Sequence, residues 1–190
     1  RLAAWHRLLF ADGGGLLGPV RVGCWRDDHS GPMQVVSGPI GRMRVHFQAP
    51  PAVQIPAEMR RFLAWVNSDG KPVGAGSSSP LIKAGLAHLW FVTIHPFEDG
   101  NGRIARAIGD MLLARAEGTE RRFYSLSAQI QRERKSYYEI LERTQKGTLE
   151  VTEWLRWFLQ TLDEAIWQAM ELIDGVLERG RFWKRLAGHP

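Results

Sequence analysis

The hydrophobic positions of this chain recur mainly at helical spacing, with apolar side chains three or four residues apart. We expect amphipathic helices over residues 1–10, 56–67, 103–118 and 127–147, and a last one that starts near Thr152. The last helix has a wide apolar face, which is typical of a helix that packs on a core. The pattern therefore predicts a helical bundle.

Two segments depart from this pattern. Residues 33–47 read as two short strands around the turn Ser37-Gly38-Pro39, so we expect one β-hairpin beside the helices. Residues 80–94 are apolar on nearly every side. They form either a buried helix or, in the LWFVTI half, a buried strand. The expected fold class is all-α, a helical bundle with one small β-hairpin.

The composition suits one domain with an appendage. The chain has 190 residues, of which 44% are hydrophobic. We expect a core domain over residues 1–150 and C-terminal helices over residues 151–190 that pack on it. The chain begins at Arg1 without Met, so we expect a piece of a longer protein. Cys24 is the only cysteine, which fits a reducing, cytoplasmic compartment.

The charge balance excludes few classes of binding partner. The net charge is +5, but bases and acids are mixed, as in QRERK at residues 131–135. Such mixing is typical of solvated helix faces, and nucleic-acid binding is kept as an alternative. No apolar run reaches the ~18 residues of a membrane-spanning helix, so we expect no membrane partner.

The candidate chemistry lies in the stretch HPFEDGNGR, which starts at His95. Pro96 pushes His95 out of the α region, so the preceding helix should end there with the imidazole at the edge of a loop. Phe97 is alone among polar residues and should anchor the loop in the core. Gly100 and Gly102 permit positive φ and expose bare backbone.

The helix that begins near Arg103 would present unpaired N–H groups to an anion. Arg103 and Arg106 are three residues apart and share one face, which suits a polyphosphate. Asn101 tolerates a left-handed conformation and brings an amide. Asp99 is an oxygen ligand suited to Mg²⁺, and His95 could accept a proton from an attacking hydroxyl. These residues together predict transfer from a nucleoside triphosphate to a hydroxyl.

A dinucleotide-binding loop is one alternative. GNGRIA, at residues 100–105, fits the fingerprint G-x-G-x-x-G/A, with LWFVTI as its strand and Glu120 about 20 residues on. Against it, HPFED separates that strand from the glycines, where the fingerprint needs a tight turn.

A purely structural corner is the other alternative. Pro96 and Phe97 would then turn the chain between two core helices. Arg103 and Arg106 would be solvated, and Asp110 would pair with Arg106 at the i,i+4 spacing.

The loop and the helix after it match a known motif. HPFEDGNGRIAR, at residues 95–106, resembles the full motif of Fic domains, H-P-F-x-D/E-G-N-G-R-x-x-R, with every fixed position filled. A looser resemblance runs from Trp5-His6 through the hairpin to about Thr152. It implies the Fic fold, a helical bundle with a hairpin flap, over residues 1–150.

Members of this family are mostly AMP transferases, which move AMP from ATP to a Ser, Thr or Tyr hydroxyl of a target protein and release pyrophosphate. The resemblance implies ATP as substrate and Mg²⁺ as cofactor, with His95 as general base, Asp99 as the Mg²⁺ ligand and Phe97 as anchor. The residues that it implies for the phosphates are Gly100, Asn101, Gly102, Arg103 and Arg106.

The resemblance also implies that the hairpin at residues 33–47 is a flap that pairs with the backbone of the target and aligns its hydroxyl. A hairpin that only packs on the core is the alternative. The flap residues expected to meet the target are Val35, Val36, Ser37, Gly38, Arg42 and Met43. Tyr137 and Tyr138 are candidates for contact with the base or ribose, with burial as the alternative, and His88 is expected to be a packed core histidine.

Many relatives carry an inhibitory helix, Ser/Thr-x-x-x-Glu-Gly/Asn, whose glutamate pairs with the second arginine of the motif, here Arg106. Glu117-Gly118 comes closest, but Leu113 holds the Ser/Thr position. We expect the inhibitory helix to lie upstream of Arg1, on a partner, or to be absent. The expected partner is a protein substrate docked by the flap, and self-modification and a homodimer are further options.

Other activities of the fold stay open. They are transfer of another nucleotide, of phosphocholine or of a bare phosphate, and removal of AMP. The phosphotransferase relatives carry lysine where this chain has Gly102, which disfavours the bare phosphate. FWKRLAG near the C-terminus resembles the linker to a DNA-binding module of some relatives. A non-catalytic fragment that binds nucleotide or DNA is therefore the remaining alternative.

Overall fold

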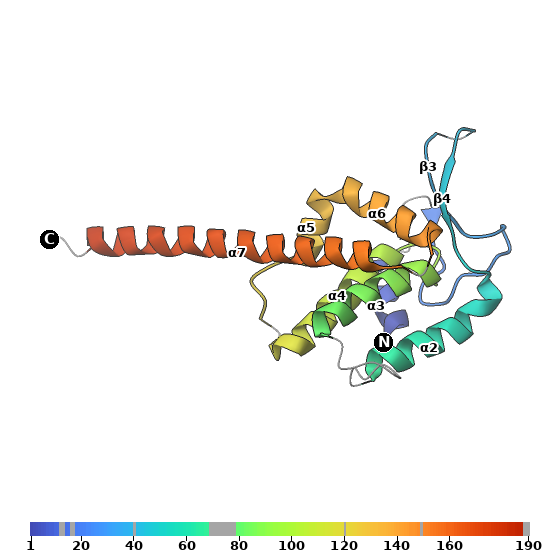
Figure 1. Ribbon diagram of the computed structural model, residues 1–190, viewed down its shortest axis with the longest axis horizontal. Helices are drawn as coiled ribbons and strands as arrows, with labels where there is room; N and C mark the ends of the chain where they lie inside the picture. Colours follow the sequence, from blue (N-terminus) through green and yellow to red (C-terminus); the bar gives the residue numbers. More distant parts are fainter. Residues whose placement is uncertain are drawn as a thin grey trace.

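The structure is a computed structural model that describes residues 1–11, 14–15, 18–39, 41–68, 79–119, 121–148 and 150–187. Its helices are α1 (Leu2–Leu9), α2 (Ile55–Asn67), α3 (Pro80–Ile94), α4 (Asn101–Glu117), α5 (Leu126–Arg132), α6 (Arg134–Lys146) and α7 (Thr152–Ala187). Figure 1 shows a helical bundle with a hairpin projecting from one side, so the expected fold class is confirmed.

Helix α3 lies at the centre of the bundle, packed against α2, α4 and α7. Its apolar residues point in every direction, which explains why so much of the helix is buried. The buried positions are Ala84, Gly85, Ala87, His88, Leu89, Phe91, Val92 and Ile94. LWFVTI is therefore helical, and the dinucleotide fingerprint lacks the strand that it needs.

Helix α4 starts two residues earlier than expected, at Asn101 rather than near Arg103. Gly100 precedes it in the left-handed region at φ 80°, and Gly118 ends it at φ 65°. Both positions favour glycine because a Cβ atom makes this conformation costly. Ile104 and Ile108, each 1% exposed, face the core, so the opposite side of α4 is left for Arg103 and its neighbours.

The single helix expected over residues 127–147 is instead divided at Glu133 into α5 and α6. The Glu133 carboxylate accepts hydrogen bonds from Gln129 Nε2 (2.7 Å) and from the Thr161 hydroxyl (3.2 Å) on α7. Its carbonyl accepts one from the Ser136 hydroxyl (3.0 Å). We attribute the break to these contacts, of which the one with Thr161 on α7 is not revealed by helical spacing alone.

The C-terminal part is one helix of 36 residues rather than several. Only its first half packs on the bundle, through Trp154, Phe158, Thr161, Leu162 and Ala165. The second half projects away from the other elements and includes the first residues of FWKRLAG (Figure 1). The expectation that residues 151–190 pack on the core therefore fails for this second half.

The predicted hairpin consists of β3 (Gln34–Ser37) and β4 (Arg44–Gln48), which pair antiparallel with a bulge between Val35 and Val36. A second, unpredicted pair joins the two-residue strands β1 (Gly14–Gly15) and β2 (Gly18–Pro19). A short 3-10 turn, η1 (Ala52–Gln54), leads from the hairpin into α2. Within the described ranges, no helix has both the length and the apolarity needed to cross a bilayer.

The core contains one buried polar pair, His88 and Tyr137. The Tyr137 hydroxyl and His88 Nε2 are 3.0 Å apart, and both side chains are almost completely inaccessible. His88 Nδ1 has no hydrogen-bond partner among the described residues. Burial, followed by the charge of Arg106, lowers the pKa of His88 to about 3. His88 is thus the packed core histidine that the sequence predicted.

We expect Tyr137→Phe to lower the free energy of unfolding by about 1–3 kcal/mol, because it would leave both ring nitrogens of His88 buried without a partner. Urea denaturation of the variant measures this change. Tyr138→Phe is the matched control, since Tyr138 is 49% exposed and its hydroxyl can bind water instead. Equal free energies of unfolding for Tyr137→Phe and Tyr138→Phe would contradict the hydrogen bond assigned between Tyr137 and His88.

Candidate active site

His95 ends α3 in an unusual backbone conformation. It is the only described residue other than glycine with positive φ, at 51°. Such a conformation costs about 1–3 kcal/mol and persists only where the surroundings enforce it. The helix therefore ends where Pro96 predicts, and the imidazole lies at the edge of the loop.

The imidazole is oriented by its own helix. Nδ1–H donates to the Val92 carbonyl (3.2 Å), so Nε2 carries the lone pair. Burial lowers the pKa of His95 to about 4; the Val92 carbonyl and Asp99 oppose this shift, and the charge of Arg26 adds to it. His95 is therefore neutral at physiological pH and able to accept a proton at Nε2.

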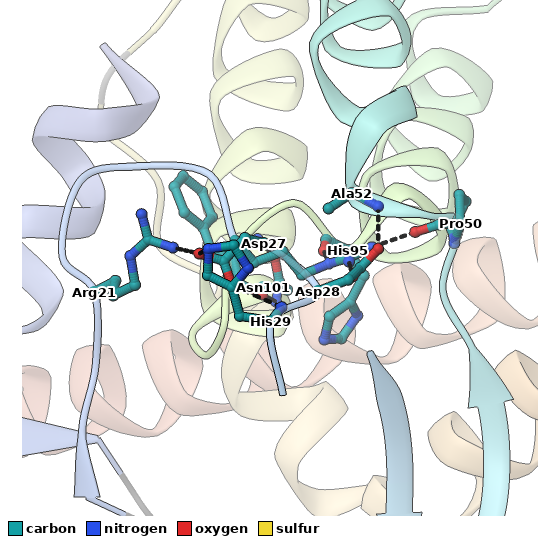
Figure 2. A network of polar contacts seen from close by, with 10 residues as sticks. Arg21, Asp27, Asp28, His29, Pro50, Ala52, His95 and Asn101 are labelled. Atoms are coloured by element: carbon teal, nitrogen blue, oxygen red, sulfur yellow. Dashed lines mark hydrogen bonds and ion pairs between the residues drawn. The ribbon is translucent and has the colours of Figure 1, made fainter. Parts of the chain in front are cut away.

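Arg26 holds the backbone around His95. Its side chain is 0% exposed, and Nε–H donates to the His95 carbonyl (2.8 Å). Its backbone N–H donates to the Pro96 carbonyl (2.9 Å). The guanidinium also donates to Asp28 (2.7 Å) and to the Pro50 carbonyl (2.5 Å). Figure 2 shows Asp28, Pro50 and His95 gathered in this network.

Phe97 and Asn101 close the loop from inside. Phe97 is 0% exposed and stacks on His6 with ring centroids 4.0 Å apart, as an anchor should. Asn101 Oδ1 accepts from the Phe97 N–H (2.9 Å), and Nδ2 donates to the Phe97 carbonyl (2.8 Å). With Asn101 only 2% exposed, its amide shapes the loop. The predicted phosphate contact through this side chain is therefore not supported.

His6 supports the loop from α1. Its Nε2–H donates to the Asp99 carbonyl (3.1 Å), and its Nδ1 accepts from the Gly23 N–H (3.0 Å). Burial is the largest cause of a lowered pKa at His6, so the neutral ring is the form that fits this arrangement. A protonated ring would place a second N–H against the Gly23 donor.

The start of α4 presents an open surface for an anion. A Cβ atom built on Gly102 would meet only Arg106 Nη1, at 3.7 Å, so packing does not require glycine at this position. Close approach of a ligand to the backbone does explain it. Arg103 is exposed on the same turn and lies over the Phe10 ring at 4.6 Å. Bare amides, a helix N-terminus and a guanidinium together suit a polyphosphate.

Asp99 fits a cation ligand beside that surface. Its Oδ1 accepts from the Gly100 N–H (2.5 Å), and its Oδ2 lies 3.6 Å from Arg103. Its side chain remains 36% exposed. Among the described residues, no group of three or more His, Cys, Asp or Glu side chains could hold a metal. Mg²⁺ would therefore need phosphate oxygens and water as its further ligands.

Arg106 does not have the helix partner that spacing predicted. Asp110 instead binds Arg122 (3.0 Å), and Arg122 also contacts Glu117 (3.4 Å). Arg106 lies next to Gly102 and close enough to His88 for its charge to lower the pKa of that ring. Among the described residues, the close i,i+4 ion pair between Asp110 and Arg106 that the structural corner expects is thus replaced by the Asp110–Arg122 pair, although the charge of Arg106 still acts on Asp110 and opposes the rise of its pKa that burial causes.

The two tyrosines proposed for the base or ribose differ in position. Tyr137 is 4% exposed with its hydroxyl on His88, so its placement contradicts direct contact with a nucleotide. Tyr138 is 49% exposed and lies 5.7 Å from the guanidinium of Arg134. Only Tyr138 therefore remains available as a surface contact.

The hairpin is fastened to α6 by one carboxylate, Glu142. It accepts hydrogen bonds from Arg44 (2.7 Å) and His46 Nδ1 (2.5 Å) on β4, and from Lys146 (2.7 Å). His46 Nε2 in turn accepts from the Ser37 hydroxyl (2.6 Å). The hydrogen bonds from Lys146, then His46 and Arg44, lower the pKa of Glu142 to about 2.

The predicted flap residues lie mostly on the exposed part of the hairpin. Val35 is half-buried, whereas the others are exposed: Val36, Ser37, Gly38, Arg42 and Met43. Gly38 is required by the turn, because φ is 102° and a Cβ atom would lie 2.8 Å from the Arg42 carbonyl. In the described residues, β3 pairs only with β4, which leaves its outer edge open to another strand.

Sequence reasoning gave no role to Arg26, Asp28, His6 or Glu142, and it named His6 only as the start of the looser resemblance. All four contact backbone groups or side chains far away in the sequence; Arg26 and His95, for example, are 69 residues apart. Trp25-Arg26-Asp27-Asp28 is a charged run inside a Gly- and Pro-rich segment. This charged run is the one feature of the local sequence that indicates a specific role for the segment.

Comparison with known proteins finds a family model and several relatives that match this chain. The family model described as Fic/DOC family matches residues 1–113. The protein named protein adenylyltransferase Fic from Drosophila ananassae is 33% identical over 118 residues, which is 60% of this chain and 21% of that protein. Its counterpart from Drosophila melanogaster is 32% identical over 118 residues. The chain therefore spans about a fifth of the length of these relatives, 21% and 22%.

Two solved structures share the fold. A Fic family protein from Desulfovibrio desulfuricans G20 superposes with a TM-score of 0.66 at 26% identity, covering 90% of this chain and 46% of that one. A Fic domain containing signaling protein from Bacteroides thetaiotaomicron VPI-5482 gives a TM-score of 0.61 at 21% identity, covering 90% and 59%. The second likeness supports the fold alone.

We expect the protein to lose stability as the pH falls from about 7 to about 5, because the unfolded chain takes up protons on His6, His88 and His95 before the folded chain does. Their pKa values lie below the ordinary 6.5 in the folded state, so the stabilisation is present above that value. Melting temperatures across this range measure the effect. A flat profile would contradict neutral burial of the three rings.

Proposed function

The chain belongs to the Fic/DOC family, and from this premise we propose that it transfers AMP from ATP to a hydroxyl group of a target protein, releasing pyrophosphate. The observation that carries the proposal is the position of a neutral His95, with its Nε2 lone pair available, beside the open N-terminus of α4. Relatives that are named protein adenylyltransferase Fic support the choice of AMP.

The reaction follows from the placement of these groups. The target hydroxyl attacks the α-phosphorus while its proton passes to His95 Nε2. The bond from the α-phosphorus to the bridging oxygen breaks, and pyrophosphate leaves with that oxygen. Bound phosphates would raise the pKa of His95 from about 4, because negative charge nearby favours the protonated ring. That shift improves the base at the moment when it is needed.

The start of α4 would bind the triphosphate. The backbone amides of Asn101 and Gly102 and the guanidiniums of Arg103 and Arg106 would replace the water that a polyphosphate loses, whereas the Gly100 N–H already donates to Asp99. Asp99 would hold Mg²⁺, which neutralises charge on the phosphates when it is bound. The left-handed His95 and the buried Arg26 would keep the base at a constant distance from this site.

The hairpin would present the target. An extended segment of the target protein could add to the open edge of β3, which supplies main-chain hydrogen bonds without selecting side chains. The Glu142 cluster would keep the hairpin at a constant angle to α6 and thus the target hydroxyl near His95. This mode of docking allows Ser, Thr or Tyr as the acceptor.

We expect His95→Ala to reduce transfer of label from α-labelled ATP to protein by roughly 10²–10⁴-fold, the usual contribution of a general base. Scintillation counting of precipitated protein, from lysate incubated with the chain, ATP and Mg²⁺, measures the transfer. His29→Ala is the control because His29 is exposed and outside the loop. If protein takes up label from γ-labelled ATP but not from α-labelled ATP, the activity is phosphotransfer and the proposed AMP transfer is wrong.

We expect Glu142→Gln to raise KM for the protein target by roughly tenfold while changing kcat less, because the hairpin would lose its attachment to α6. Steady-state transfer at varied target concentration separates the two constants. Glu139→Gln is the matched control on the same helix, since Glu139 is exposed and its ion pair with Lys135 (3.9 Å) lies within α6. An unchanged KM would show that the attachment does not position the target.

A further inference from the structure

The backbone of His95 adopts a conformation that is unfavourable for two separate reasons. A residue with a Cβ atom rarely takes positive φ, and a residue that precedes a proline is biased toward extended backbone. His95 precedes Pro96 and nevertheless lies in the left-handed region, at φ 51° and ψ 58°. Without a contact that enforces this conformation, the His95 backbone would relax toward an extended one and carry the imidazole away from its present place.

The proline also determines what the imidazole binds. In a continuous helix the carbonyl of Val92 would accept the N–H of residue 96, but Pro96 has no N–H. His95 Nδ1–H donates to this carbonyl instead, at 3.2 Å. Because a carbonyl can only accept, the contact requires the proton on Nδ1 and leaves the lone pair on Nε2. The tautomer of His95 therefore depends on the ring staying beside Val92.

Arg26 holds the two carbonyls on either side of Pro96. Its Nε–H donates to the His95 carbonyl (2.8 Å), and its backbone N–H donates to the Pro96 carbonyl (2.9 Å). The guanidinium is itself fixed by Asp28 (2.7 Å) and by the Pro50 carbonyl (2.5 Å). Its side chain is 0% exposed, so bulk water does not compete for these contacts. The His95 peptide is thus held by a donor that cannot easily move.

The other supports of the loop act after Pro96. The Asn101 amide binds the backbone of Phe97, and His6 binds the Asp99 carbonyl. These contacts fix the loop beyond the proline, whereas the guanidinium fixes the peptide bond before it. The orientation of the base therefore depends on a residue of a different segment, 69 positions away in the sequence.

We propose that Arg26 is a positioning residue, which keeps His95 in the Nδ1–H tautomer and thereby keeps Nε2 able to accept a proton. Loss of the Nε–H donor would release the His95 peptide, and the ring would leave the Val92 carbonyl. A ring without that acceptor favours the tautomer with its proton on Nε2, as a histidine side chain does in water. Such a ring cannot take a proton from a hydroxyl at Nε2. The catalytic consequence rests on the function proposed above, whereas the tautomer does not.

NMR of the ring nitrogens, in the whole chain with isotope-labelled histidine, tests the proposal. At neutral pH the ring is uncharged, since its pKa is about 4, and His95→Gln identifies its signals. We expect a protonated Nδ1 in the natural sequence and a proton mainly on Nε2 in Arg26→Lys. Lysine keeps a positive charge for Asp28 but has a methylene group where arginine has Nε. His46 is the internal reference, because its Nδ1 lies 2.5 Å from Glu142, outside the loop.

Two control variants separate positioning from a general loss of stability. Asp28 accepts from the guanidinium and from the Ala52 N–H (2.6 Å), so Asp28→Asn should lower the melting temperature. It leaves Arg26 Nε–H in place, and the tautomer of His95 should therefore stay unchanged. Arg21→Lys is the matched exchange at an exposed arginine of the same segment, and it should change neither the tautomer nor the activity. If Arg26→Lys does not fold, the variant R26Q/D28N takes its place, because it leaves no unpaired charge in the interior.

Transfer kinetics form the second arm. Arg26→Lys should lower kcat for AMP transfer by roughly 10- to 100-fold and leave KM for ATP nearly unchanged, because the start of α4 keeps its groups for the phosphates. A natural chain without transfer would refute the proposed function but not the assigned tautomer. A proton on His95 Nε2 in the natural chain would overturn the inference, as would an unchanged tautomer in Arg26→Lys or the same change in Asp28→Asn. A changed tautomer with an unchanged kcat would overturn the role in catalysis.

Discussion

The candidate site depends on one buried guanidinium. Arg26 loses its hydration entirely, and this is costly unless every donor finds a partner. Burial accordingly lowers the pKa of Arg26, against the effect of Asp28. The partners are Asp28 and the carbonyls of His95 and Pro50. Because these carbonyls belong to segments far apart in the chain, the arginine joins the loop to the segment between β4 and η1. The left-handed His95 persists since its carbonyl has a fixed, charged donor.

The same loop is rigid on its inner side and open on its outer side. Phe97, Asn101 and His6 use their polar and aromatic groups on the loop itself, which satisfies its buried backbone. The outer side carries the Gly102 backbone and an exposed Arg103 at the start of α4. This division explains why residues 95–103 contain both groups that hold the loop in place and groups that could bind or react with a ligand. A rigid inner side holds the base, and an open outer side leaves room for an anion.

Short-range sterics made much of the loop predictable from the sequence. Pro96 ends α3, Gly100 takes positive φ, and Phe97 has nowhere favourable to lie except the core. The sequence led us to expect a phosphate contact from the Asn101 side chain, because an amide binds a phosphate or a backbone group equally well. Only the burial of its side chain decides between them. The break of the predicted helix at Glu133 was missed because the Glu133 carboxylate accepts a hydrogen bond from Thr161, which lies on α7 and is distant in the sequence.

The sequence by itself determined the helical bundle, the hairpin, the family and the conformation of the loop. The bundle, the hairpin and the loop depend on periodicity or on the backbone limits of proline and glycine, which act over a few residues, whereas the family rests on the resemblance of residues 95–106 to a known motif. Tertiary structure decided which groups support that loop and where packing stops. Arg26 and His95 are 69 residues apart, and His46 and Glu142 are 96 apart, distances over which local patterns carry no information. The apolar face of α7 likewise continues beyond Ala165, at the exposed Leu172 and Val176, because the size of the bundle, and not the helix, determines where contact ends.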